Sequence, residues 1–169
     1  LIEYSDLECP YCKIFHNTMN EVMKAYPNGE VAWVFRHFPL DSLHRQARSE
    51  AEAAKCVSEI AGNNAFWNYI DKIFVATKSN DGLDLSLLPK FATEIGVSEK
   101  DFTKCLADKD TKEAVQQEVD EAILAGGQGT PFVILVTNQG EKIDLGGAVP
   151  LESLKQIIDE KLTSLNETN

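Results

Sequence analysis

Apolar positions at the start of the chain predict alternating strands and helices. Leu1 to Ser5 is typical of a strand, and residues 10–25 carry apolar side chains at three- and four-residue spacing, as an amphipathic helix does. Residues 31–35 are β-branched, aromatic and almost continuously apolar, which indicates a strand buried on both faces. A strand, a helix and a second strand after a short return predict a βαβ unit with parallel strands.

The middle of the chain has a different pattern, because residues 42–125 contain no convincing strand. Apolar residues at helical spacing and two capping-box patterns predict about five helices there. These helices are expected at residues 43–61, around 66–74, around 88–95, from Ser98, and from Asp110 to about Leu124.

Strands return near the end of the chain. Residues 131–136 and 142–145 flank a turn at residues 138–140 and predict a β-hairpin, and an amphipathic helix is expected from Leu151 to Leu165. This order predicts an α/β fold in which one domain is interrupted by an all-helical insertion. The expected boundaries are residues 1–40 and 126–169 for the two parts of the α/β domain, and 41–125 for the insertion.

Composition and charge narrow the class of protein. The 169 residues are 43% hydrophobic and 25% charged, which is typical of a globular domain, and no run reaches the ~18 apolar residues of a membrane span. A net charge of −11 argues against binding to nucleic acid or to an anionic membrane surface. Because the chain does not begin with Met, we expect a processed or trimmed piece whose leader or membrane tether is not visible.

The strongest chemical signal is Cys9-Pro10-Tyr11-Cys12 at the start of the first predicted helix. Unpaired N–H groups at a helix N-terminus favour a thiolate, so Cys9 is expected to be the reactive sulfur. Cys12 lies one turn deeper and is expected to resolve a mixed disulfide. An inert disulfide or half of a zinc site are the alternatives, but zinc needs two more ligands and no second close pair of Cys or His exists.

Two other features fit a thiol site. Glu3 shares a strand face with Leu1 and Ser5, so it either points into the sheet, where burial would raise its pKa and let it exchange protons with Cys12, or faces water on an edge strand. The Thr130-Pro131 bond at the hairpin entry is either an ordinary trans bond or a cis bond that leaves neighbouring backbone groups free to bind an extended peptide.

The histidines give a weaker signal. His16, His37 and His44 are scattered, and no two of them form a metal-ligand pair on one helix face. His16 lies four positions beyond Cys12, but an exposed helical histidine is the expected state. Core packing is expected of four aromatic residues, Trp33, Phe66, Trp67 and Phe74.

Together, the Cys9–Cys12 motif, Thr130-Pro131 before a hairpin and the helical insertion resemble the DsbA-like thiol-disulfide oxidoreductases of the thioredoxin superfamily. The resemblance covers nearly the whole chain and implies a thioredoxin-like fold. It also implies a cis-proline loop facing the cysteines, and a buried acidic residue at Glu3, six positions before Cys9.

Residues 35–40 before the Ala-rich helix also look like this family, but the dipeptide departs from it. Pro10-Tyr11 is similar to glutaredoxin, whereas the best-known DsbA has Pro-His. Glutaredoxins are much shorter and lack the helical block, so the departure bears on redox potential more than on fold.

The resemblance also bears on Cys56 and Cys105, which as residues alone are compatible with a bridge or with two buried thiols. Because some DsbA-like proteins carry a structural disulfide in this domain, a Cys56–Cys105 bridge is favoured, and such a bridge would place the protein outside the cytoplasm.

The function that the resemblance implies is the introduction of disulfides into unfolded or extended polypeptides. No cofactor and no metal are expected. The resemblance also implies a membrane-bound partner that reoxidises the enzyme. Two alternatives are a reductase or glutathione-dependent enzyme with the same cysteines, and a non-catalytic soluble module of a membrane protein. The oligomeric state is not predicted.

Overall fold

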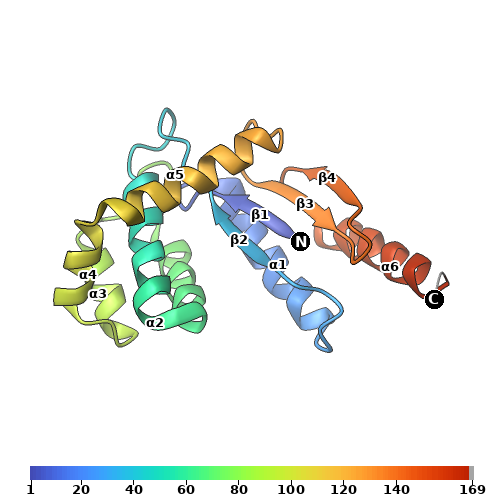
Figure 1. The fold of residues 1–169 in the computed structure, drawn as a ribbon, viewed down its shortest axis with the longest axis horizontal. Helices are drawn as coiled ribbons and strands as arrows, with labels where there is room; N and C mark the ends of the chain where they lie inside the picture. Colours follow the sequence, from blue (N-terminus) through green and yellow to red (C-terminus); the bar gives the residue numbers. More distant parts are fainter. Residues whose placement is uncertain (168–169) are drawn as a thin grey trace.

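The structure is a computed structural model that describes residues 1–167, and its centre is a four-stranded sheet (Figure 1). The strand order is β2-β1-β3-β4. β1 pairs parallel with β2, and β3 pairs antiparallel with β1 and β4, which confirms the predicted βαβ unit and hairpin. The strands are β1 (Ile2–Ser5), β2 (Val34–His37), β3 (Phe132–Val136) and β4 (Lys142–Gly146).

The predicted helices are all present in the described part of the chain. Their bounds are α1 (Pro10–Ala25), α2 (Ala47–Ala76), α3 (Leu87–Glu94), α4 (Glu99–Leu106), α5 (Lys109–Leu124) and α6 (Leu151–Glu167). Ser98 caps α4 as predicted, whereas α5 is capped by Asp108 and not by Asp110, because the Asp108 side chain accepts the Asp110 N–H. The side chain of Leu165 lies outside the described residues.

The second strand begins three residues later than predicted. Its pairing with β1 starts at Val34, opposite Ile2, so residues 31–33 lead into the sheet without belonging to it. Val31 and Trp33 are apolar because they pack against the core beside α1 and α6. The prediction of a strand buried on both faces was wrong, because β2 lies at the edge of the sheet, Val34 is 41% exposed, and Phe35 is the only buried residue of 31–35.

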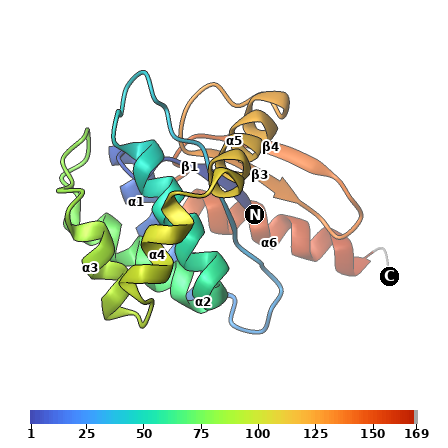
Figure 2. The ribbon, with the colours of Figure 1, turned by 60° about the vertical axis from the view of Figure 1, so that its left-hand side comes forward.

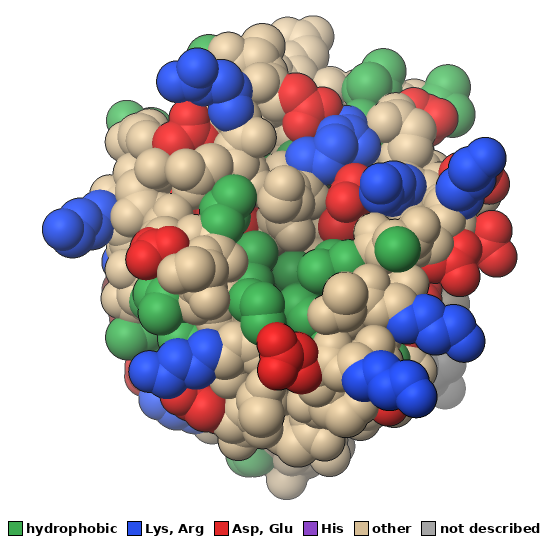
Figure 3. Space-filling view, turned by 90° about the vertical axis from the view of Figure 1, so that its left-hand side faces the viewer, with side chains coloured by type: hydrophobic (Ala, Val, Ile, Leu, Met, Phe, Trp, Pro, Cys, Tyr) green, Lys and Arg blue, Asp and Glu red, His purple; other side chains and the backbone are tan. Residues whose placement is uncertain are grey.

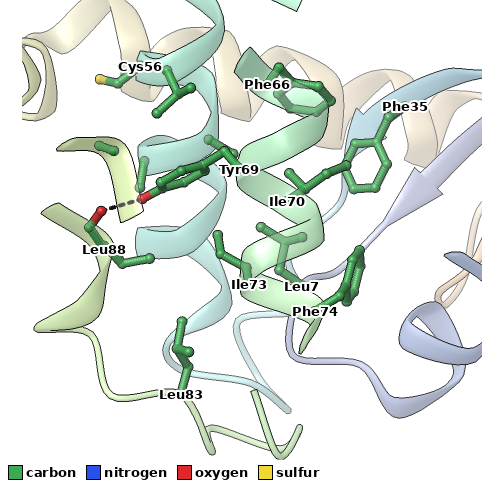
Figure 4. Close-up of a cluster of buried hydrophobic side chains, with 14 of the residues drawn as sticks. Leu7, Phe35, Cys56, Phe66, Tyr69, Ile70, Ile73, Phe74, Leu83 and Leu88 are labelled. Atoms are coloured by element: carbon green, nitrogen blue, oxygen red, sulfur yellow. Dashed lines mark hydrogen bonds between the residues drawn. The ribbon is translucent and has the colours of Figure 1, made fainter. Parts of the chain in front are cut away.

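Gly62 divides α2 into the two helices that the sequence predicts. Its φ of 80° and ψ of −176° are non-helical, and the positive φ is one that glycine adopts at little cost. The two halves fold back on each other (Figures 1 and 4).

Helices cover both faces of the sheet (Figure 2). α1 and α6 pack with β3 on one face, and the second half of α5 packs on the other. The first set of buried residues includes Phe15, Met19, Val133, Leu154 and Ile158, and the second includes Tyr4, Phe38, Val119, Ala122 and Phe132. Because α5 also packs on α2 and α4, the end of the predicted insertion is a helix shared between both parts of the molecule.

The helical block has its own apolar cluster, which extends to the end of β1 (Figure 4). Tyr69 is fully buried in it, and its hydroxyl donates to the Leu88 carbonyl oxygen at 3.0 Å. The predicted aromatic packing is confirmed, since Phe66 and Phe74 are buried and the Trp33 and Trp67 rings lie 4.4 Å apart. Leu7, Cys9 and Cys12 belong to the same cluster, so the cysteine segment lies between the helical block and the sheet.

The outer face of the helical block is mostly polar. In Figure 3, apolar side chains gather in a central hollow, with Lys, Arg, Asp and Glu side chains around it. Within residues 1–167, no helix has the length and apolar character needed to cross a membrane.

Candidate dithiol active site

The junction between β1 and α1 positions the two motif cysteines. Cys9 is the N-cap residue of α1, with extended φ and ψ of −76° and 125°, and Pro10 occupies the first turn, where no backbone N–H is needed. Cys12 follows one turn later. Both are free thiols and both are buried, Cys12 completely and Cys9 with 4% of its surface exposed. Tyr11, between them, is 64% exposed.

The pKa values of the two thiols are shifted in opposite directions. A hydrogen bond with the Cys12 side chain lowers the pKa of Cys9 to about 6, although burial opposes the shift. The Thr130 side chain and backbone N–H groups at Tyr11 and Cys12 act in the same direction. Burial raises the pKa of Cys12 well above its ordinary value, and its hydrogen bond to Cys9 and the charges of Cys9 and Glu3 add to this. The arrangement favours a thiolate on the outer sulfur and a thiol on the inner one.

Glu3 lies inside the molecule, because β1 is a central strand and not an edge strand. Burial raises the pKa of Glu3 to about 7, while the hydrogen bond from Trp33 opposes the shift. The Trp33 indole N–H donates to Glu3 Oε2 at 2.9 Å, and Oε1 has no hydrogen-bond partner among the described residues. Glu3 is therefore a buried carboxyl group with a raised pKa, and its charge contributes to the raised pKa of Cys12.

Residues far away in sequence complete the surroundings of Cys9. The Thr130–Pro131 bond is cis, and Cys9 Sγ lies 3.4 Å from the Thr130 carbonyl oxygen. The hairpin entry thus comes into direct contact with the start of α1, from 121 positions away.

The other two cysteines are joined to each other. Cys56 in the first half of α2 and Cys105 in α4 form a disulfide with an S–S distance of 2.03 Å and a Cα–Cα distance of 5.7 Å. The bond links two helices of the helical block, whereas Cys9 and Cys12 are free thiols.

Sequence reasoning missed a set of buried acidic groups beside the cysteines. The Glu8 carboxylate, fully buried next to Cys9, accepts hydrogen bonds from the Thr77 hydroxyl at 2.8 Å and from the N–H groups of Gly82 and Leu83 at 3.0 and 3.1 Å. A Cβ atom at residue 82 would lie 2.7 Å from the Ser79 carbonyl oxygen, so glycine at this position allows the loop to keep its conformation. Glu8 therefore anchors the loop after α2 to the cysteine segment.

Glu50 and Asp6 complete this buried set. Burial and the neighbouring carboxyl group of Glu8 raise the pKa of Glu50 to about 9, so Glu50 carries a proton at neutral pH. Asp6 accepts hydrogen bonds from the N–H groups of Glu8 and Leu40 and contacts His44 Nδ1 at 2.9 Å. The only sequence signal was the pair of acidic residues around Leu7, directly after an apolar strand.

The prediction that His16 is exposed was wrong. His16 is buried, and its Nε2 lies 2.6 Å from Asp71 in the second half of α2. The helical insertion covers this face of α1, and helical spacing alone does not show which neighbour will do so. Within residues 1–167, no three His, Cys, Asp or Glu side chains are grouped so that they could hold a metal ion.

Known proteins are similar to this chain in sequence and in fold. A family model described as Thioredoxin matches residues 1–160. A Na(+)/H(+) antiporter NhaA 3 of Salinispora tropica is 33% identical over 131 residues, which are 78% of this chain but 19% of that protein. The chain thus spans about a fifth of the length of such relatives. A probable disulfide bond formation protein D of Bacillus cereus is 25% identical, over 96% of this chain and 73% of its own length.

A crystal structure gives the same result at the level of the fold. DsbA2 of Pseudomonas aeruginosa superposes with a TM-score of 0.80 at 30% identity, over 94% of this chain and 85% of that one. The predicted thioredoxin-like fold with a helical insertion is confirmed. The chain belongs to the thioredoxin family and is a DsbA-like member of it.

Proposed function

We propose that this chain is a protein disulfide oxidoreductase that introduces disulfides into unfolded or extended polypeptides through Cys9 and Cys12. The observation that carries the proposal is that the pKa values of the two buried thiols are shifted in opposite directions. The pKa of Cys9 is lowered to about 6, and that of Cys12 is raised. A stabilised Cys9 thiolate stabilises the reduced enzyme. Stabilising the reduced form makes the disulfide form a stronger oxidant.

The exchange has two steps. A substrate thiolate attacks Cys9 Sγ of the Cys9–Cys12 disulfide, the bond between the two enzyme sulfurs breaks, and Cys12 leaves as a thiolate that takes up a proton. A second substrate thiolate then attacks the substrate sulfur of the mixed disulfide and releases the Cys9 thiolate. The substrate loses two electrons and gains a disulfide, and the enzyme gains two electrons as a dithiol.

Glu3 is proposed to supply the proton that Cys12 needs. The Cys12 thiolate forms in a fully buried place, where its charge is costly. A carboxyl group whose pKa is raised to about 7 can hold a proton near neutral pH and release it, and its unpartnered Oε1 is free to take part.

The substrate is proposed to bind beside Thr130-Pro131, where the chain turns next to Cys9. Tyr11 and Ile14, 64% and 59% exposed on the first turns of α1, offer apolar contact surface for a polypeptide. We propose an extracytoplasmic location, since the Cys56–Cys105 disulfide persists in oxidising compartments. Reoxidation by a membrane-bound partner is proposed from the family alone.

Two alternatives use the same residues differently. A reductase or glutathione-dependent enzyme would have the same cysteines with a lower reduction potential. A non-catalytic module of a membrane protein is favoured by one observation, the similarity to part of an antiporter.

The deciding experiment mixes the oxidised chain with a reduced, unfolded two-cysteine polypeptide and traps thiols over time. We expect the substrate to gain one disulfide as Cys9 and Cys12 become thiols, and we expect Cys9→Ser to remove this transfer. Transfer that persists in Cys9→Ser would exclude the catalytic assignment. If instead only the reduced enzyme reacted, by passing electrons to the disulfide of an oxidised substrate, the protein would be a reductase.

A further inference from the structure

We propose that His44 is a positioning residue of the Cys9 site, and that its imidazolium, held by Asp6, stabilises the Cys9 thiolate. The inference rests on the proposed function, because it explains how the reactive sulfur is tuned. The dipeptide between the cysteines is Pro10-Tyr11, which supplies no positive charge, so a cation near Cys9 has to come from another segment.

Asp6 links His44 to both cysteines. Its backbone carbonyl oxygen accepts the Cys9 N–H at 3.1 Å, and its own N–H donates to Cys12 Sγ at 3.4 Å. Its side-chain Oδ2 lies 2.9 Å from His44 Nδ1. One residue therefore fixes the position of the imidazole relative to the two sulfurs.

Backbone hydrogen bonds also hold the segment that carries His44. His44 lies between β2 and α2, its N–H donates to the Leu40 carbonyl oxygen at 2.9 Å, and Leu40 N–H donates to the same Asp6 oxygen at 2.8 Å. Only 6% of the His44 surface is exposed. An imidazole held against a carboxylate in this way has little freedom to turn from the site.

The electrostatics agree with this geometry. Burial alone would lower the pKa of His44, but the hydrogen bond with Asp6 and the charges of Asp6 and Cys9 raise it. The Asn80 side chain also bonds to the ring and acts in the same direction. A Cys9 thiolate thus favours the imidazolium, and by the same interaction the imidazolium favours the thiolate.

Other charged groups around His44 make its charge more important. Asp6 and Glu8 are buried acidic groups on the cysteine loop, while Glu50 carries a proton at neutral pH because its pKa is raised to about 9. Asp81, from the loop after α2, is paired with Arg45, whose side chain is exposed. Without His44, Asp6 would oppose ionisation of Cys9 from close by with no cation held against it.

The test is a titration of the Cys9 thiolate, followed by its ultraviolet absorbance, in the reduced full chain with the Cys56–Cys105 bond intact. In His44→Asn, which keeps an amide donor for Asp6 but no charge, we expect the pKa of Cys9 to rise by about one unit. The thiolate fraction well below that pKa then falls about tenfold. His44→Lys restores a positive charge and is expected to recover most of the shift.

His16→Asn is the matched control, because His16 also pairs with a carboxylate, Asp71, but lies on the side of α1 that faces the second half of α2. We expect the Cys9 titration to stay unchanged in this variant. An unchanged titration in His44→Asn, or an equal shift in His16→Asn, would overturn the proposal.

A second measurement needs no substitution. The ring of His44 is titrated by NMR in the reduced and the disulfide form, and we expect its pKa to fall on oxidation, when the Cys9 thiolate is lost. An unchanged His44 pKa would overturn the inference. Both titrations are independent of any substrate, so failure of disulfide transfer with a normal His44 effect would reject the proposed function alone.

Discussion

Both cysteine pairs lie at or within helices, but the surroundings of the two pairs differ. Cys9 and Cys12 lie three residues apart at the start of α1, next to backbone N–H groups, Thr130 and the acidic Glu3. Cys56 and Cys105 lie 49 positions apart on two packed helices and are already bonded. Cys56 is fully buried in the apolar cluster of the helical block.

The comparison shows that burial alone does not decide whether a cysteine is reactive. Cys9 and Cys56 are both buried, yet only Cys9 lies at a helix N-terminus with groups that favour a thiolate. Cys12 is as buried as Cys56, but the charges of Cys9 and Glu3 act on its thiol. The position at a helix N-terminus and the groups that favour a thiolate therefore distinguish the proposed exchange site from the structural bond.

The largest expected effect is that of Cys9→Ser. Because the outer sulfur makes and breaks the bond with the substrate, we expect disulfide transfer to fall about a thousandfold or more. Cys12→Ser should instead accumulate a long-lived mixed disulfide through Cys9, visible by mass spectrometry. A mixed disulfide at Cys12 in place of Cys9 would reverse the assigned roles.

Replacing the other pair, Cys56→Ser with Cys105→Ser, should act on stability and not on exchange. Closing a loop across 49 positions is worth about 4 kcal/mol on the chain-entropy model, so denaturant unfolding should show a loss of about that size. The Cys9 titration is expected to stay the same under folding conditions. A shifted Cys9 pKa in the folded variant would show that the two pairs are coupled.

Glu3→Gln should slow disulfide exchange and raise the free energy of unfolding. Between about pH 4.5 and 7 the folded protein keeps a proton on Glu3 that the unfolded chain loses, so the Glu3 contribution to the free energy of unfolding falls as pH rises through this window. Glutamine removes this penalty while still accepting the Trp33 N–H. We expect a gain approaching about 3 kcal/mol above pH 7 and none below pH 4.5.

The same variant should slow disulfide exchange by about tenfold or more, because Cys12 loses its proton partner. Stopped-flow kinetics with a model disulfide checks the rate, and denaturant unfolding at several pH values checks the stability. Equal stability of both proteins at all pH values would show that Glu3 is not held protonated by burial.

Thr130→Val has the smallest expected effect. Loss of a hydroxyl that favours the Cys9 thiolate should raise the pKa of Cys9 by less than about one unit. Thr111→Val is the control, since the Thr111 hydroxyl lies 3.8 Å from Cys56 Sγ, in the other pair. Identical Cys9 titrations in the parent and Thr130→Val would exclude the hydroxyl as a source of the shift.

Much of this architecture could be predicted from apolar periodicity and motif spacing. The strands, the helices and the break between residues 61 and 66 follow from patterns within short windows. The first residue of β2 could not be predicted in this way, because apolar residues before a strand and within it look alike until the partner strand fixes the register.

The buried polar groups could not be found in this way. Glu8 is satisfied by donors 69 to 75 positions away, and Asp6 by a histidine 38 positions away. A single sequence does not show such pairs, since an acidic residue in a loop is usually solvated. His16 failed for the same reason, because its partner Asp71 is 55 positions away.

The most direct test of the account measures both cysteine pairs at once. The intact chain is equilibrated in glutathione buffers from reducing to oxidising, thiols are trapped, and each pair is quantified by mass spectrometry. We predict that Cys9–Cys12 becomes reduced in buffers where thioredoxin would still be a disulfide, while Cys56–Cys105 stays oxidised. Reduction of both pairs together, or a Cys9–Cys12 bond as resistant as Cys56–Cys105, would contradict the account.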